Sequence, residues 1–90
     1  MKNQETNEEG ASALALAALG WTLSEPGRAD RLLALTGLGP GELRASLGET
    51  ATLAAILRFL EAHEPDLIAC ADFLGVAPAA LVAARRRLEA

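Results

Sequence analysis

Apolar residues recur along the chain with the spacing of an α-helix. The clearest example comprises Leu53, Ile56, Leu57 and Leu60, at positions i, i+3, i+4 and i+7. This spacing places the four side chains on one side of a helix. Glycine, proline and capping residues divide the rest of the chain into similar segments. The expected helices run from Ala11 to Leu23, from Pro26 to Gly37, from Pro40 to Gly48, from Thr50 to Glu64, from the residue after Pro65 to Gly75, and from Pro78 to Leu88. Ser24 and Thr50 are the expected N-caps of the second and fourth helices. The pattern therefore predicts an all-α fold, a compact single-domain bundle of five or six short helices.

The first of these segments is apolar on nearly every side. Leu16 and Leu19 belong to one stripe, and Leu14 and Ala18 belong to a second stripe beside it. Two stripes together cover most of the circumference, so this helix is expected to be the most buried one. Over the whole chain, the core is expected to be led by Leu16, Leu19, Trp21, Leu35, Leu57, Leu60, Phe73 and Leu81.

The N-terminal segment differs from the rest. Residues 1–9 are polar and acidic, and none after Met1 is apolar. Such a segment cannot bury enough surface to offset the entropy lost on ordering. We therefore expect a disordered tail over residues 1–10 and a helical domain over residues 11–90.

Composition narrows the fold and the compartment. The 90 residues include 20 Ala and 17 Leu but only two Val, two Ile and no Tyr, which excludes a sheet-dominated fold. The net charge of −4 has the wrong sign for a general polyanion binder. A single cysteine, Cys70, cannot form an internal disulfide, and the uncharged stretch from Gly10 to Ser24 has too short an apolar centre to span a bilayer. A cytoplasmic protein without membrane association is expected.

Residues capable of catalysis or metal binding are few. His63 and Cys70 are each the only residue of their kind, and Pro65 between them breaks the helical phase. A Cys–His pair also needs an orienting group and an oxyanion site, so no catalytic residue is expected. The acidic residues around His63 lack paired-ligand or calcium-loop spacing. No metal site, no cofactor and no enzymatic activity are therefore expected.

Two polar positions lie at a predicted corner between helices. Thr36 can hydrogen-bond back to its own helix, and Arg44 can reach the free carbonyls near Gly37 or the carboxylate of Glu64. We interpret Thr36, Arg44 and Glu64 as a structural tie across the corner, with a ligand contact at Arg44 as the alternative.

The abundance of apolar residues suggests an interaction surface. Hydrophobic types make up 51% of the chain, and so small a domain cannot bury them all. The expected patch joins the first helix to the alanine-lined face of the last, through Leu14, Ala18, Ala79, Val82 and Ala83. The expected function is a non-enzymatic protein–protein interaction module that binds a partner protein or a second copy of itself.

Residues 67–88 also have the spacing of a helix-turn-helix around Gly75. In that alternative the protein is a DNA-binding regulator, and Arg85, Arg86 and Arg87 contact phosphates. The second helix, however, presents alanines where base readout needs long polar side chains. Nucleic acid is therefore not the expected partner.

Several of these segments resemble a known family. They are Ala18-Leu19 and Trp21, Leu33-Ala34-Leu35-Thr36-Gly37-Leu38, Pro40, Leu43-Arg44, Leu53-Ala54-Ala55-Ile56-Leu57, Phe59, Glu64, Ala69-Cys70, Gly75, Pro78 and Ala84-Arg85. Together they are similar to domain of unknown function family 3572, short all-helical proteins found mainly in alphaproteobacteria. The resemblance implies an all-helical architecture over about residues 11–90 and a bacterial source, and it implies no substrate.

Overall fold

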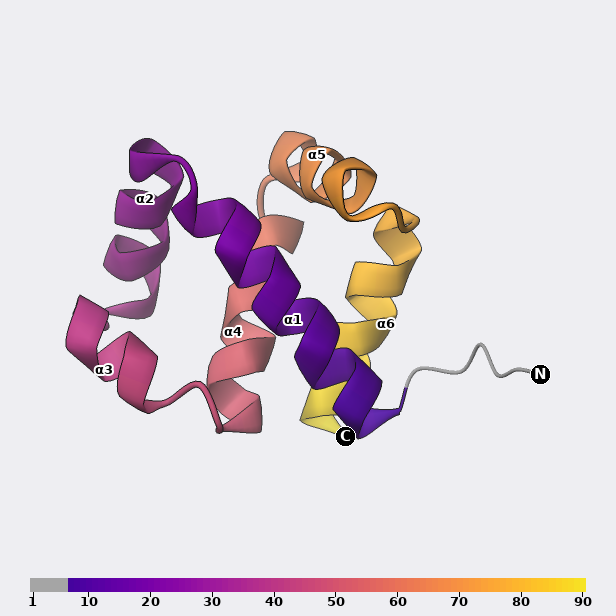
Figure 1. The fold of residues 1–90 in the computed structure, drawn as a ribbon, viewed down its shortest axis with the longest axis horizontal. Helices are drawn as coiled ribbons and strands as arrows, with labels where there is room; N and C mark the ends of the chain where they lie inside the picture. The colour runs from indigo at the N-terminus through magenta and orange to yellow at the C-terminus, as the bar shows by residue number, and fades with distance from the viewer. Residues whose placement is uncertain (1–6) are drawn as a thin grey trace.

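The structure, a computed structural model, describes residues 7–90 and consists of six α-helices joined by short turns (Figure 1). They are α1 (Glu8–Leu23), α2 (Pro26–Thr36), α3 (Pro40–Ala45), α4 (Thr50–Glu61), α5 (Glu64–Leu74) and α6 (Pro78–Glu89). No strand occurs between residues 7 and 90. The predicted all-α single domain is confirmed.

The first helix begins earlier than the sequence pattern predicts. Asn7 caps α1, since its Oδ1 accepts a hydrogen bond of 2.6 Å from the backbone N–H of Gly10. Glu8 and Glu9 then lie in the first turn, where negative charge interacts favourably with the helix dipole. Residues 8–10, assigned to the tail from their polarity, are therefore helical. Residues 1–6 of the predicted tail lie outside the described part of the chain.

Several other helix ends also differ from expectation. Glu25, not Ser24, caps α2, because its carboxylate accepts the Arg28 N–H at 2.8 Å. Ser24 instead donates its hydroxyl to the last turn of α1. The third helix ends at Ala45 and the fourth at Glu61, each three residues before the expected boundary. The residues at the end of a helical sequence pattern often lack regular helical hydrogen bonds, so the helix itself ends earlier.

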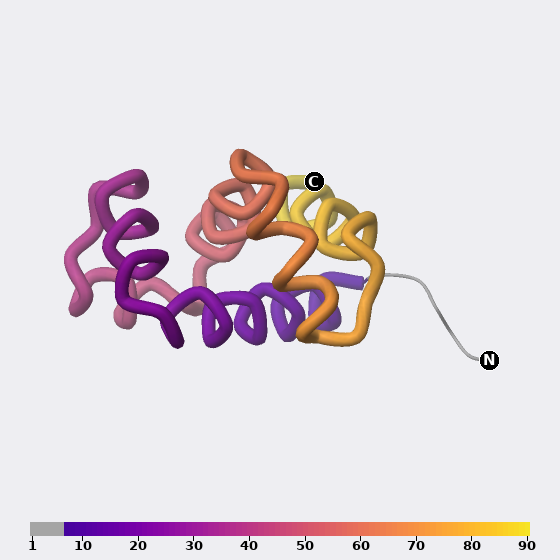
Figure 2. The backbone as a smooth tube through the Cα atoms, turned by 90° about the horizontal axis from the view of Figure 1, so that it is seen from above, coloured from indigo at the N-terminus to yellow at the C-terminus, as the bar shows by residue number. Residues whose placement is uncertain are grey.

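The long helix α1 organises the domain. It crosses the middle of the molecule and packs against α4, α5 and α6, and it also contacts α2 (Figure 1). Seen from above, α1 lies along one long side, and the other helices project from it (Figure 2). The molecule measures 40 × 25 × 18 Å, and its centre is the contact of α4 and α6 with α1.

The buried side of α1 is made mainly of small residues, with Leu19 as its one large side chain. Ala11, Ala15 and Ala18 are fully buried, which lets the axis of α1 come close to α4 and α6. Two larger side chains on the same helix point outward: Leu16 is 42% exposed and Leu23 is 44% exposed. The most buried helix is therefore α4, not α1 as its all-round apolar pattern predicts.

The predicted core is half correct. Leu19, Leu57, Leu60 and Leu81 are buried, and Trp21 is partly buried against the core. Three others are wrong, because Leu16, Leu35 and Phe73 all lie on the surface, Leu35 with 66% and Phe73 with 72% of its area exposed. Helical spacing indicates which apolar residues share one side of a helix, but it does not indicate which side a neighbouring helix will cover.

Gly75 adopts a left-handed backbone conformation, with φ of 75°, at the end of α5. Replacing Gly75 with alanine should lower the free energy of unfolding by about 1–2 kcal/mol, because a Cβ is strained in this conformation. The matched control is Gly20→Ala, inside α1, where an added Cβ meets no atom within 4 Å. That control should raise the free energy of unfolding by about 0.5–1 kcal/mol. Urea denaturation of both variants measures these changes, and a neutral Gly75→Ala would contradict the assigned turn.

Candidate functional site

The residues considered for catalysis do not form a reactive site. Cys70 is fully buried on α5, and burial raises the pKa of its thiol to about 11. His63 is exposed and precedes the first residue of α5. Between residues 7 and 90, no three side chains of His, Cys, Asp or Glu are grouped to hold a metal ion.

Cys70 should react with a thiol reagent only when the domain unfolds, because the reactive thiolate is disfavoured in the core. In the unfolded chain the thiol has a pKa of about 8.5. Above that pH the unfolded chain loses a proton that the folded chain keeps, so stability should fall as pH rises from about 8.5 toward 11. Reaction with Ellman's reagent at increasing urea tests the first point. Urea midpoints of the parent and Cys70→Ala between pH 8 and 10 test the second, since only the parent should show this extra slope.

The predicted apolar patch is interrupted at Ala18. Ala18 is fully buried and Leu14 is partly buried against the core. On α6, Ala79 and Ala83 are exposed and Val82 is partly buried, so Ala18 is the residue of the predicted patch that lies fully in the core. The outward side of α1 is a different stripe, formed by Ala13, Leu16, Ala17, Gly20 and Leu23.

Of the predicted structural tie across the corner, the structure contains the Thr36 hydrogen bond but not the Arg44 contact. Thr36 donates its hydroxyl to the carbonyl of Leu32 at 2.9 Å, as expected. Among the described residues, Arg44 makes no hydrogen bond or ion pair to Glu64 or to the carbonyls near Gly37. Arg44 instead borders a small apolar cavity of about 170 Å³ between α1, α2 and α3, and Glu64 is exposed at the start of α5.

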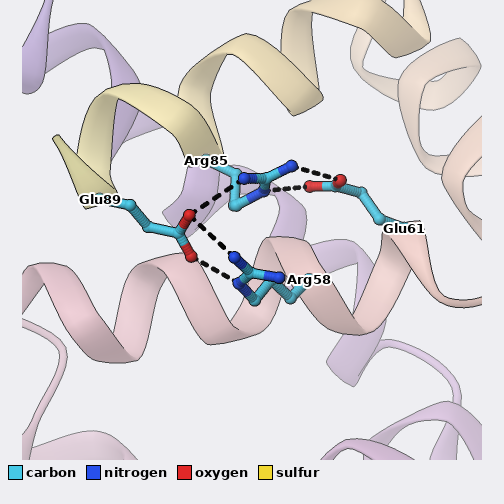
Figure 3. A network of polar contacts seen from close by, with 4 residues as sticks. All are labelled: Arg58, Glu61, Arg85 and Glu89. Carbon is cyan, nitrogen blue, oxygen red and sulfur yellow. Dashed lines mark hydrogen bonds and ion pairs between the residues drawn. The ribbon is translucent and has the colours of Figure 1, made fainter.

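The three consecutive arginines of α6 have different environments. Arg85 donates two hydrogen bonds of 2.9 Å to Glu61 on α4 and one of 3.0 Å to Glu89 on its own helix. Arg58 on α4 also pairs with Glu89 and completes a four-residue network between the two helices (Figure 3). The Arg58 and Arg85 guanidiniums hold the pKa of Glu89 below its usual range. Arg85 is therefore engaged within the domain, whereas Arg86 and Arg87 are exposed.

An apolar groove lies between α2 and α4. It consists of two cavities of about 370 and 360 Å³ that share Leu35 and Phe59 as lining residues. The first is lined by Arg31, Ala34, Leu35, Phe59, Ala62 and His63. The second is lined by Leu35, Thr36, Leu38, Ala51, Thr52, Ala55, Arg58 and Phe59. The exposed Leu35 side chain stands where the two cavities meet.

The side of α4 that faces the groove follows from its sequence. The buried residues Leu53, Ile56, Leu57 and Leu60 form one side of the helix. At about 100° per residue, Ala51 and Ala55 fall on the opposite side, together with Ala62, the residue that caps the end of the helix. Because alanine side chains do not fill the space beside α2, a groove remains. The groove consequently opens on the side of α4 away from the core.

All ionisable residues that line the groove are basic types. They are Arg31, Arg58 and His63, and no Asp or Glu lines either cavity. The Arg31 guanidinium lies 5.6 Å from the centre of the Phe59 ring and pairs with Asp66 through one nitrogen at 3.2 Å. Its side chain is half exposed, at 50%, so further N–H groups remain for a ligand. Arg58 is likewise paired, with Glu89, so acidic neighbours balance the charge of both arginines at the groove.

The sequence pattern does not predict this groove. Leu35 is expected in the core, and no functional role is expected for Phe59. The available signal was the alanine spacing of α4, since Ala51, Ala55 and Ala62 repeat on the side opposite the leucines. That signal indicates a weakly covered helix side, but it does not indicate which helix lies beside it.

The fold and site define a small all-α domain with an apolar surface groove bordered by two ion-paired arginines. The chain matches the family described as "Protein of unknown function (DUF3572)" over residues 8–90, nearly its whole length, and it belongs to that family. No curated protein and no solved structure is significantly similar to it. Within residues 7–90 no single helix has both the length and the apolarity to cross a bilayer, although the bent pair of α5 and α6 meets those criteria together.

Proposed function

We propose that this protein is a non-enzymatic docking module of the bacterial cytoplasm, and that the groove between α2 and α4 binds a protein partner. The observation that carries the proposal is Leu35, a large apolar side chain with 66% of its area exposed at the junction of two mainly apolar cavities. Contiguous exposed apolar surface on a small domain commonly marks an interaction site. Of the two residues considered for catalysis, His63 borders the groove, whereas Cys70 is buried in α5 and lines neither of its cavities.

Site-specific photo-crosslinking tests this function. A photoreactive amino acid is placed at Ala62, in the groove, or at the control position Ala83, which is exposed on α6. In the native host, the Ala62 probe should give a crosslinked protein product, and the Ala83 probe should not. The product should disappear in the Leu35→Glu background, whose melting temperature should stay close to that of the parent because Leu35 is exposed. Equal products from both positions, or a product insensitive to Leu35→Glu, would count against the groove.

DNA binding is the second candidate, and one observation favours it. Helices α5 and α6 meet at 99° around the Gly75 turn, within the range of about 90–120° typical of helix-turn-helix motifs. Against it, Arg85 is held by Glu61 and Glu89, which leaves Arg86 and Arg87 as the exposed cations of α6. A mobility-shift assay at low salt should give no shift at micromolar protein. A salt-sensitive shift that is lost in Arg86→Gln/Arg87→Gln would favour the DNA-binding function instead.

A further inference from the structure

We infer that the cavity between α1, α2 and α3 binds a small carboxylate with a compact apolar body, and that Arg44 pairs with the carboxylate group. The cavity has a volume of about 170 Å³ and is lined by five leucines, by Pro40 and by Arg44. None of these residues lines the groove between α2 and α4. The site is therefore separate from the proposed docking function.

The short helix α3 explains why this space is left unfilled. Helix α3 lies at one end of the molecule beside α2 (Figure 1), and its six residues make fewer than two turns. Leu43 is its one buried residue, and Leu47, beyond its end, is only partly buried. Leu19 and Leu33 form the facing wall on α1 and α2. One buried side chain on α3 does not fill the space in front of this wall, so a cavity remains.

The opening of the cavity combines apolar surface with one cation. Leu23, Pro40 and Arg44 line the cavity and are also exposed, so these three residues border its opening. Leu23 has 44% of its area exposed, and a bound ligand would cover part of that surface. The stem of an arginine packs on apolar neighbours while its guanidinium stays in water. Arg44 can therefore present a positive charge beside the apolar interior.

Arg44 is not neutralised within the domain. Arg31 and Arg58, which line the groove cavities, are ion-paired with Asp66 and Glu89. Arg44, by contrast, has no ion pair and no side-chain hydrogen bond with any residue from 7 to 90. Its guanidinium donors are consequently available to a ligand.

The acidic residues closest to Arg44 in the chain do not occupy this site. The Glu42 carboxylate accepts the backbone N–H of Gly39 at 2.8 Å. Neither Glu42 nor Glu49 lines the cavity, and Arg44 is the only charged residue that does. An incoming anion therefore meets no carboxylate in the lining.

This lining favours an anion with an apolar body. A guanidinium pairs with a carboxylate through two parallel N–H···O bonds. An apolar protein cavity of about 150 Å³ holds one benzene molecule, so a cavity of about 170 Å³ has room for one aromatic ring or a branched chain of similar size. An inorganic anion would leave the leucines uncovered, and a hydrocarbon would leave Arg44 unpaired. The ligand class is therefore a monocarboxylate of about the size of benzoate.

An NMR titration of the isotope-labelled protein with benzoate at pH 7 tests this inference. Benzoate should shift the amide signals of Leu19, Leu43 and Leu47 in a saturable way, with a Kd in the millimolar range because the ligand is small. Acetate has the charge without the ring, and benzyl alcohol has the ring without the charge. Each should bind at least about fivefold more weakly than benzoate, since each makes only one of the two interactions.

Two pairs of variants separate the charge from the cavity. Arg44→Gln should weaken benzoate binding by about 3- to 10-fold and change benzyl alcohol binding by less than about twofold, because only benzoate makes a charge-assisted hydrogen bond. Arg87→Gln is the control, since Arg87 is exposed on α6 and does not line the cavity. Leu23→Glu should abolish benzoate binding by placing a carboxylate at the opening. Its control is Leu16→Glu, at a similarly exposed position of α1 outside the lining.

Several results would overturn the inference. Acetate that binds as tightly as benzoate would show that the apolar cavity has no part in binding. Benzoate shifts that persist unchanged in Arg44→Gln, or that lie away from the cavity, would exclude Arg44 as the partner of the carboxylate. A titration without saturable shifts up to about 50 mM would exclude this ligand class, since it corresponds to negligible affinity. None of these results bears on crosslinking from Ala62, so the docking function stands or fails independently.

Discussion

Replacing Leu81 with alanine is expected to lower the free energy of unfolding by about 2–5 kcal/mol, the range for a buried leucine that leaves a cavity. Leu81 is fully buried on α6, the helix that packs against both α1 and α4 at the centre of the domain. A small domain has a total stability of only about 5–15 kcal/mol. This one substitution should therefore remove a large share of it, measurable as a lower urea midpoint.

Leu35→Ala provides the matched control, because it makes the same chemical change at a side chain that is 66% exposed. Its effect should stay within about 0.5 kcal/mol, as for most surface substitutions. Similar losses at Leu81 and Leu35 would mean that the α2–α4 groove is closed and that Leu35 belongs to the core. The pair of variants thus tests the fold and the candidate site together.

Replacing Glu61 with glutamine is expected to lower the free energy of unfolding by about 1–3 kcal/mol, because a partly buried charge then lacks its main partner. The Arg85 side chain is only 16% exposed, and Glu61 accepts two of its hydrogen bonds (Figure 3). Glutamine keeps the size of the side chain but offers one acceptor oxygen and no charge. Urea denaturation at neutral pH measures the loss.

Glu64→Gln is the control for this second prediction, since Glu64 is exposed at the start of α5 and forms no ion pair with a described residue. Its effect on stability should be small, because exposed charges contribute little. If Glu61→Gln is equally mild, the network between α4 and α6 contributes little to stability, and Arg85 becomes available for other contacts. That outcome would strengthen the DNA-binding alternative.

The helices of this protein were largely predictable because their signals are local. Pro26, Pro40 and Pro78 each stand at the start of a helix, and Gly37 and Gly75 each end one in a left-handed conformation. The α4 pattern also predicted its buried side correctly. Each of these features depends on residues within one or two turns of one another, so no knowledge of the packing is needed.

The candidate site was not predictable in the same way. Helix α1 is apolar on all sides, so its sequence could not say that Ala18 faces the core and Leu16 faces solvent. The small side chains of α1 are buried because they allow α4 and α6 to approach its axis closely. The same uncertainty placed Leu35 in the core, although the neighbouring side of α4 carries alanines too small to cover it.

The sequence by itself determined that this is an all-α domain, where most helices begin and end, and that a Cys–His or metal site has no supporting pattern. The tertiary structure decided which apolar side chains remain exposed, that Arg85 is bound by Glu61 and Glu89, and that α2 and α4 leave an apolar groove between them. The physical reason is the range of the interactions involved. Helix propensity, capping and helical spacing depend on residues that are close together in the chain. Burial and ion pairing depend on which helices meet, and that is settled by the packing of the whole domain.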